Sequence, residues 1–267
     1  MSADRGLDGL DRRRALDLSP RPGAAPFLRM VAAQAAIEAR LMLRNGEQLL
    51  LAVVIPVIVL IGGVTGADHL GLDLAHRPVD EFTPGVLALA VMSTAFTSLA
   101  IATGFERRYG VIKRLGSSPL PRSGLLAGKV GALLAVEVFQ VAVISVVGAL
   151  LGWDPANGVV GALLAVVAGT FAFAALGLLV AGVLRAEATL AAANLVYLLL
   201  MAGGAVVLPS SSYGAFGHVT EWLPSGALGD GMRQACLEGG VAWRDLGVLV
   251  VWGVLGTVLT ARTFRWE

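Results

Sequence analysis

The amino-acid sequence predicts an all-α membrane protein that crosses the bilayer six times. The 267-residue chain is 56% hydrophobic and only 15% charged, whereas about a quarter of the residues in a soluble domain are charged. Several windows of 17 or more residues contain no charged residue, and such windows are long enough for membrane-spanning helices. The charged residues lie between these windows, so the sequence divides into apolar spans and polar connections.

Two segments are expected before the first apolar window. Residues 1–25 are rich in charge and proline and lack apolar periodicity, which predicts a disordered cytoplasmic tail. Residues 26–267 are expected to form one domain, which opens with a helical pattern at 26–48. The charged residues that mark one face of this helix are Arg29, Arg40, Arg44 and Glu47. We expect an amphipathic helix in the cytoplasmic membrane interface, with a straight extension of the first span as the alternative.

The apolar windows give the positions of the six spans. They are expected near residues 49–65, 84–104, 125–151, 157–184, 188–208 and 246–263. Pro56 should kink the first span, because proline removes a helical hydrogen bond. The third and fourth spans are longer than a hydrocarbon core of about 30 Å requires, so they should tilt or project beyond it.

The segment between the fifth and sixth spans, residues 209–245, is too polar to cross a membrane and too apolar for a free loop. It contains Leu223-Pro224 and a short helical pattern near 226–236. We expect a re-entrant or interfacial helix at the outer side.

The distribution of basic residues orients the spans. Seventeen of the 20 lysines and arginines fall on one side of the predicted topology, and only Arg77, Arg233 and Arg244 fall on the other. The acidic residues of the 68–81 connection lie on the side that is poor in basic residues. The positive-inside rule therefore places both termini in the cytoplasm, in a multi-pass protein of the plasma (inner) membrane.

Motifs for soluble chemistry are missing from the sequence. The segment Gly124–Lys129 has three residues between its glycines where a phosphate loop has four, and Val130 stands where that loop needs Ser or Thr. No paired-histidine zinc pattern and no nucleophile-elbow serine occur, and Cys236 is the single cysteine. The histidines are expected in outer loops as solvated residues. These patterns predict a chain that is not an enzyme, binds no metal or cofactor, and does not bind nucleic acid.

Four polar residues inside the spans are candidates for a transport path. Glu137 lies near the middle of the third span, where a carboxylate costs about 2.5–3.5 kcal/mol and should face the bundle interior or a wet cavity. Gln140 follows on nearly the same helix face. Asn194 and Tyr197 share a face of the fifth span. The alternatives are a protonated Glu137 hydrogen-bonded to a neighbouring helix and a packing role for the other residues.

A basic hairpin of 24 residues, Glu106–Lys129, joins the second and third spans on the cytoplasmic side. Gly110 should break the chain after the second span, and Pro119 and Pro121 should force a turn before the third. Between them, Val111 and Leu115 can pack on a partner while basic side chains face water or acidic groups. A short helix of this kind can receive force from a soluble partner.

The hairpin resembles the first cytoplasmic connection of type-2 ATP-binding-cassette (ABC) transporter permeases. The matching elements are Glu106-Arg107, Gly110, Lys113-Arg114-Leu115, Pro119-Leu120-Pro121-Arg122 and Gly128-Lys129. The interface helix, the six-span layout and Leu223-Pro224 with Arg233 are also similar, so the resemblance covers residues 26–265.

This resemblance implies a permease subunit of an exporter, which depends on a separate ATPase subunit that binds ATP and Mg²⁺. Two permeases, either identical or sister chains, would pair with two ATPases, with the transport path along the permease interface. The residues that would couple to the ATPase are Glu106, Arg107, Gly110, Val111, Lys113, Arg114, Leu115 and Pro119.

Other function classes have weaker support in the sequence. An ATPase-independent secondary transporter would use Glu137 as a proton-coupling carboxylate, but no repeat of broken helices is evident. A membrane-bound enzyme lacks a catalytic cluster, and a structural or assembly role is the remaining alternative.

We predict that Glu106→Ala and Leu115→Asp each abolish transport without preventing membrane insertion, because both residues belong to the segment that would receive force. Transport is measured in cells that also express the cognate ATPase, and insertion is measured from the amount of protein in the membrane fraction. Normal transport by both variants would contradict the coupling assignment.

Overall fold

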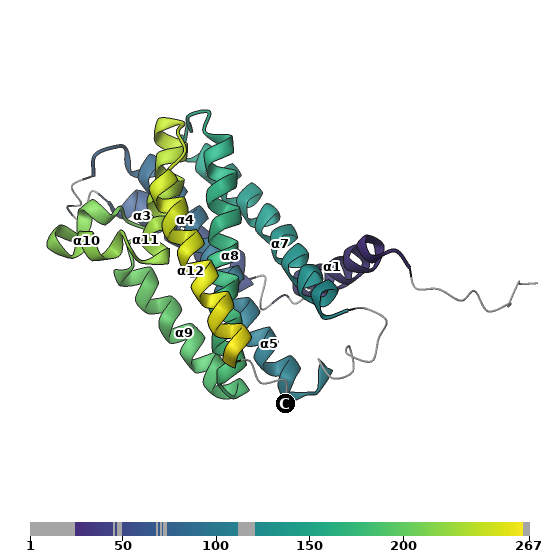
Figure 1. Cartoon of the computed structure of the whole chain (residues 1–267). Coiled ribbons are helices and arrows are strands. Elements are labelled where there is room, and N and C mark those ends of the chain that lie inside the picture. The colour runs from purple at the N-terminus through teal and green to yellow at the C-terminus, as the bar shows by residue number, and fades with distance from the viewer. Residues whose placement is uncertain are drawn as a thin grey trace, which may run out of the picture.

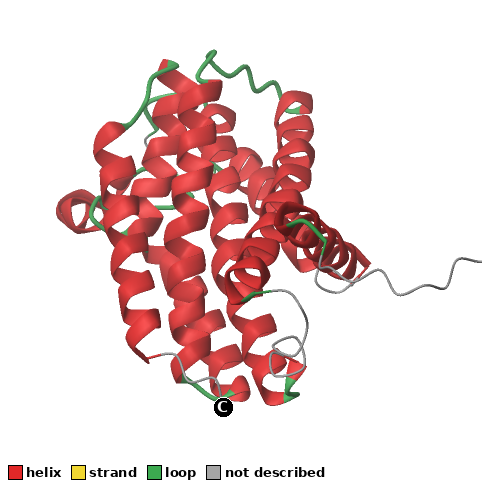
Figure 2. Cartoon of the chain, turned by 45° about the vertical axis from the view of Figure 1, so that its right-hand side comes forward, coloured by secondary structure: helices red, strands yellow, loops and turns green. Residues whose placement is uncertain are grey.

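Every regular element that the computed structural model describes is a helix (Figure 1, Figure 2). The described residues are 25–44, 46, 50–67, 69, 71, 74–111 and 121–263. Within them, five helices are long and apolar enough to cross a membrane: Pro78–Arg108, Ser123–Leu150, Val159–Val183, Ala186–Gly203 and Trp243–Thr263. A shorter apolar helix, Ala52–Gly66, precedes them. The protein is therefore a helical multi-pass bundle, and a sixth crossing remains a prediction.

The N-terminal part contains two separate helical segments. Helix α1 (Phe27–Arg44) lies outside the main bundle (Figure 1). A π-helical turn η1 (Leu50–Val54) leads directly into α3 (Ile55–Gly66), and Pro56 occupies the first turn of α3. The predicted tail and most of the connection between α1 and η1 lie outside the described residues.

The second span is the centre of the bundle. It consists of α4 (Pro78–Met92), a π-helical stretch η2 (Ser93–Ser98) and α5 (Leu99–Arg108). Nearly all of α4 is buried, including Asp80 and Glu81 in its first turn. The span begins six residues before the expected start, because these two carboxylates are paired inside the protein. Arg77 donates to Asp80 over 2.6 Å, and His76 lies 3.0 Å from Glu81.

Four further long helices complete the bundle. They are α7 (Arg122–Leu150), α8 (Val159–Val183), α9 (Ala186–Gly203) and α12 (Trp243–Thr263). The first three pack against this central span, while the last, α12, packs against α8. The last residues of α5, α8 and α12 and the first residues of α7 and α9 lie at one end of the bundle (Figure 1). This is the end that the positive-inside rule places in the cytoplasm.

The segment before the last span is helical and buried. Helix α9 ends at Gly203, five residues before the expected end of the fifth span. The 3₁₀ helix η3 (Ser210–Phe216), α10 (Gly217–Thr220), α11 (Pro224–Arg233) and the π turn η4 (Gln234–Glu238) follow. Helix α11 packs against α4, α8 and α12 and lies below the level at which α12 begins (Figure 1). The segment is therefore helical and packed within the bundle, and its re-entrant or interfacial character remains a prediction.

A buried arginine explains why α9 stops early. Arg233 donates to the carbonyl oxygens of Val206 over 2.9 Å and Val207 over 2.5 Å. It also donates to Asp230 over 2.8 Å and lies 3.6 Å from Glu81. The non-helical backbone after α9 therefore finds its hydrogen-bond partner in a side chain of α11, as backbone inside a membrane protein must.

Two glycines let this non-helical backbone enter the bundle. A Cβ atom on Gly85 of α4 would lie 2.3 Å from the Val207 carbonyl oxygen, and one on Gly229 of α11 would lie 2.6 Å from that of Val206. Any larger residue would push the carbonyls away from Arg233. These positions need glycine for space rather than for an unusual backbone angle.

We predict that Arg233→Lys destabilises the fold by about 3 kcal/mol, because an ammonium group cannot reproduce the fork of a buried guanidinium. The measurement is thermal unfolding of the purified protein in detergent. The matched control is Arg244→Lys, since the pair of Arg244 with Glu221 is largely exposed and contributes little. Equal shifts of the melting temperature in the two variants would contradict the structural role of Arg233.

Candidate functional site

The candidate coupling site begins at the C-terminal end of α5, where Glu106 meets a buried lysine. The Lys129 ammonium of α7 donates to Glu106 over 2.7 Å and to Glu38 of α1 over 3.3 Å. Lys129 is only 6% exposed, so these two carboxylates supply its partners inside the protein. Gln34 of α1 donates to the same Glu38. One lysine thus joins α1, the second span and the third span.

The glycine before this lysine permits the close approach of α1. A Cβ atom on Gly128 would lie 2.6 Å from the Gln34 side chain. The Gly128-Lys129 pair therefore has two local functions. The glycine admits α1 to the surface of α7, and the lysine binds the acid that α1 presents.

Arg107 and Arg108 attach the same end of α5 to two more spans. Arg107 donates to the carbonyl oxygens of Ala181 and Leu184, at the end of α8. A cation is favourable there, because the last carbonyls of a helix carry partial negative charge. Arg108 forms an ion pair with Glu187 in the first turn of α9. Three consecutive residues, Glu106 to Arg108, therefore contact α7, α8 and α9.

The second span ends immediately after this anchor. Helix α5 ends at Arg108, and Gly110 adopts a positive φ of 68°, which glycine accepts without strain. Val111 is half-buried. The other predicted coupling residues, Lys113, Arg114, Leu115 and Pro119, lie outside the described residues. Residues 112–120 are the part of the chain between Val111 and Pro121, and Pro121 directly precedes α7.

Two predicted path residues, Glu137 and Gln140, are buried between helices. Oε2 of Glu137 lies 2.6 Å from the Thr170 hydroxyl of α8. Gln140 accepts a hydrogen bond from Thr94 of η2 over 2.8 Å and donates to the carbonyl oxygen of Ala52 over 2.8 Å. Gln140 therefore fastens α7 to the first and second helical segments of the bundle.

The other two predicted path residues lie elsewhere. Asn194 is exposed on α9, and Tyr197 is half-buried with its hydroxyl bonded to Ser93 of η2. Helices α7 and α9 lie on opposite sides of α8 (Figure 1). The structure therefore does not bring the four residues together, and their transport role remains a prediction.

The described residues contain no group of three or more His, Cys, Asp or Glu residues placed to hold a metal ion. His76 lies beside Glu81, and His218 belongs to α10.

Sequence reasoning missed Glu38 and the pairing role of Lys129. The signal was present, because Lys129 is one of only two lysines and an acid occurs on the preceding amphipathic helix.

The family comparison agrees with this architecture. Residues 77–262 match the model of the ABC-2 family transporter proteins. The chain belongs to this family. It is therefore a membrane permease, and its matched region runs from the start of the second span to the end of the last.

One curated relative is "Putative transport permease YvfS" of Bacillus subtilis (strain 168). The two chains are 23% identical over 184 residues, which cover 67% of this permease and 75% of the relative. No solved structure matches the permease.

We predict that Lys129→Met loosens α1 from the bundle, because two carboxylates then face each other without their cation. The measurement is the maleimide labelling rate of a cysteine at Ala39, a buried position on α1, in a Cys236→Ala background. We expect an increase of about tenfold, the factor that corresponds to 1.4 kcal/mol.

The control for this prediction is Arg262→Met, which removes a cation from the exposed end of α12. An unchanged labelling rate in Lys129→Met would show that the lysine does not hold α1.

Proposed function

We propose that this permease is the membrane subunit of an ATP-driven exporter, and that a separate ATPase drives it through residues 106–121. The observation that carries the proposal is the anchor at Glu106–Arg108. A partner that moves the hairpin displaces the end of α5, and the ion pairs and hydrogen bonds of these residues transmit that displacement to α7, α8 and α9. Lys129 passes it on to α1 through Glu38.

The sequence of the chain supports a separate source of energy. It contains no phosphate-binding loop of its own. The proposed partner binds ATP and Mg²⁺ and docks against the face that carries the basic hairpin. This face is cytoplasmic in the proposed topology, with both termini inside and the protein in the plasma membrane.

The transport path is proposed to lie at an interface with a second permease, either another copy or a sister chain. Asn194 supports this placement, because it is an exposed amide on a span that is otherwise apolar on that face. A polar group facing lipid is unfavourable, so a protein or aqueous surface should cover it. The six-span count and the re-entrant character of α11 belong to the same proposal.

A secondary transporter remains the second candidate because of Glu137. Its Oε1 atom is buried and has no hydrogen-bond partner among the described residues. A carboxyl group with one unused oxygen is suited to exchanging a proton with water or substrate. The bond from Glu137 to Thr170 would then change with the state of transport.

The test of the proposed function is copurification of the permease with a cassette ATPase from its native membrane. We expect the wild type and Asn194→Leu to retain the ATPase, and Leu115→Asp to lose it, because only the last change lies in the docking segment. Asn194→Leu should still lower transport.

A second measurement separates the two candidate functions. Transport by the native complex should stop when ATP is depleted and should persist when the proton gradient is dissipated. The opposite result, together with loss of transport in Glu137→Gln, would replace the exporter by the secondary transporter.

A further inference from the structure

Helices α7 and α8 are consecutive in the chain but separate from each other toward the cytoplasmic end. They are joined at the outer side by residues 151–158, and α7 then diverges from α8 in Figure 1. The side-chain hydrogen bond between Glu137 and Thr170 links them near the middle of the bundle. Below this bond lies a cavity of about 260 Å³.

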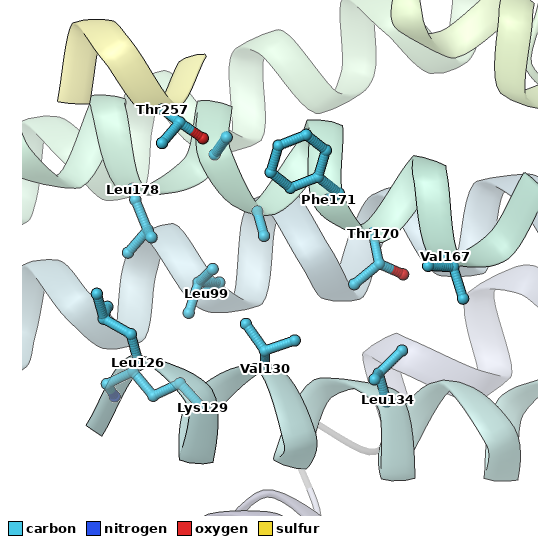
Figure 3. A pocket seen from close by; sticks show the side chains of 12 residues that line it. Leu99, Leu126, Lys129, Val130, Leu134, Val167, Thr170, Phe171, Leu178 and Thr257 are labelled. Carbon is cyan, nitrogen blue, oxygen red and sulfur yellow. The ribbon is translucent and has the colours of Figure 1, made fainter. Parts of the chain in front are cut away.

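The walls of the cavity are almost entirely apolar (Figure 3). Helix α7 contributes Leu126, Val130 and Leu134, and α8 contributes a stripe that begins at Val167 and ends at Leu178. One residue each from α5 and α12, Leu99 and Thr257, completes the lining.

The polar side chains at this cavity already have partners. The Thr170 and Thr257 hydroxyls donate to carbonyl oxygens of their own helices. Lys129 contributes its aliphatic stem, while its ammonium binds Glu106 and Glu38. None of these three polar residues therefore offers a free hydrogen-bonding group to a ligand. The remaining lining offers dispersion contacts, so the cavity suits a hydrocarbon ligand.

The shape of the cavity selects among hydrocarbon ligands. Its α8 wall, from Val167 to Leu178, covers eleven residue steps, or about 16 Å along the helix axis. A cavity of about 260 Å³ spread over this length is a narrow slot, not a groove that could take a helix about 10 Å across. One extended alkyl chain therefore suits the slot better than a helix of a second permease.

The opening of the cavity identifies the source of that chain. Val130 is 40% exposed, Val167 is 50% exposed and Phe171 is 42% exposed, so the slot opens sideways between membrane-spanning helices. The surroundings of such residues are the acyl chains of the bilayer, which run along the same direction as the helices.

We propose that the slot between α7 and α8 binds one acyl chain of a membrane phospholipid. The chain lies between the bond from Glu137 to Thr170 at one end and Lys129 at the other. It fills the space that separates the third and fourth spans, and it holds α7 in the position where Lys129 reaches Glu106 and Glu38. This site is independent of the ATPase and of the transported substrate.

The test compares two pairs of matched substitutions in purified permease. Val130→Phe with Val167→Phe places two rings in the mouth of the slot without overpacking the core, since both valines are partly exposed. Val250→Phe with Val254→Phe makes the same change on α12, where the two valines are exposed to a similar extent but do not line the slot. Palmitoyl-oleoyl-phosphatidylglycerol is added in dodecyl maltoside, and bound lipid is counted by native mass spectrometry.

We expect the wild type and the α12 variant to retain one phospholipid per chain, and the slot variant to bind it about tenfold more weakly. Equal retention by the two variants would overturn the proposal. A slot-dependent adduct with the mass of detergent, or of another apolar compound, would also overturn it.

A diazirine-labelled acyl chain on the same phospholipid provides a readout from the unmodified wild type. Crosslinks should concentrate on the α7 peptide around Val130 and the α8 peptide around Phe171. Crosslinks spread evenly over the exposed faces of α9 and α12 would show that the chain is only part of the general lipid annulus.

Discussion

The constraint on which this structure depends is that polar groups inside a bilayer must find partners within the protein. Helices gain little from burying apolar surface when the solvent is itself apolar, so packing and polar contacts hold them together. The described contacts of this kind occur at three levels. Arg233 lies toward the end of the bundle that holds α11, Gln140 and Glu137 lie in the middle, and Lys129 with its two acids lies at the end where α5 stops.

These levels have different mechanical roles. Beside α11, Arg233 fixes a non-helical stretch between α4 and α11, where glycines leave room for it. At the opposite end, Glu106–Arg108 connect the second span to α7, α8 and α9 where α5 stops. A displacement applied there acts on the whole bundle. The bond between Glu137 and Thr170 lies at one end of the apolar slot, and the ion pairs of Lys129 lie at the other. Polar contacts therefore border the region in which α7 and α8 separate.

Much of the helical layout followed from the spacing of apolar and charged residues. The starts and ends of α7, α8 and α12 lie within three residues of the expected spans. The expected break after the second span coincides with Gly110. The start of the second span and the end of the fifth span were predicted less well. Asp80 and Glu81 were assigned to an outer loop but are buried in α4, and α9 stops early because Arg233, far along the chain, binds the carbonyls that follow it.

The sequence by itself determined which segments are helical, which end of the bundle carries the basic residues, and where the second span ends, because these depend on the local order of apolar, charged and glycine residues. Only the tertiary structure decided the partners of the buried polar groups. Lys129 meets Glu38 across 91 positions, and the Glu137 carboxyl group meets Thr170 rather than Asn194 or Tyr197. Hydropathy assigns a residue to a membrane depth, but the rotation and tilt of each helix determine which side chains meet at that depth.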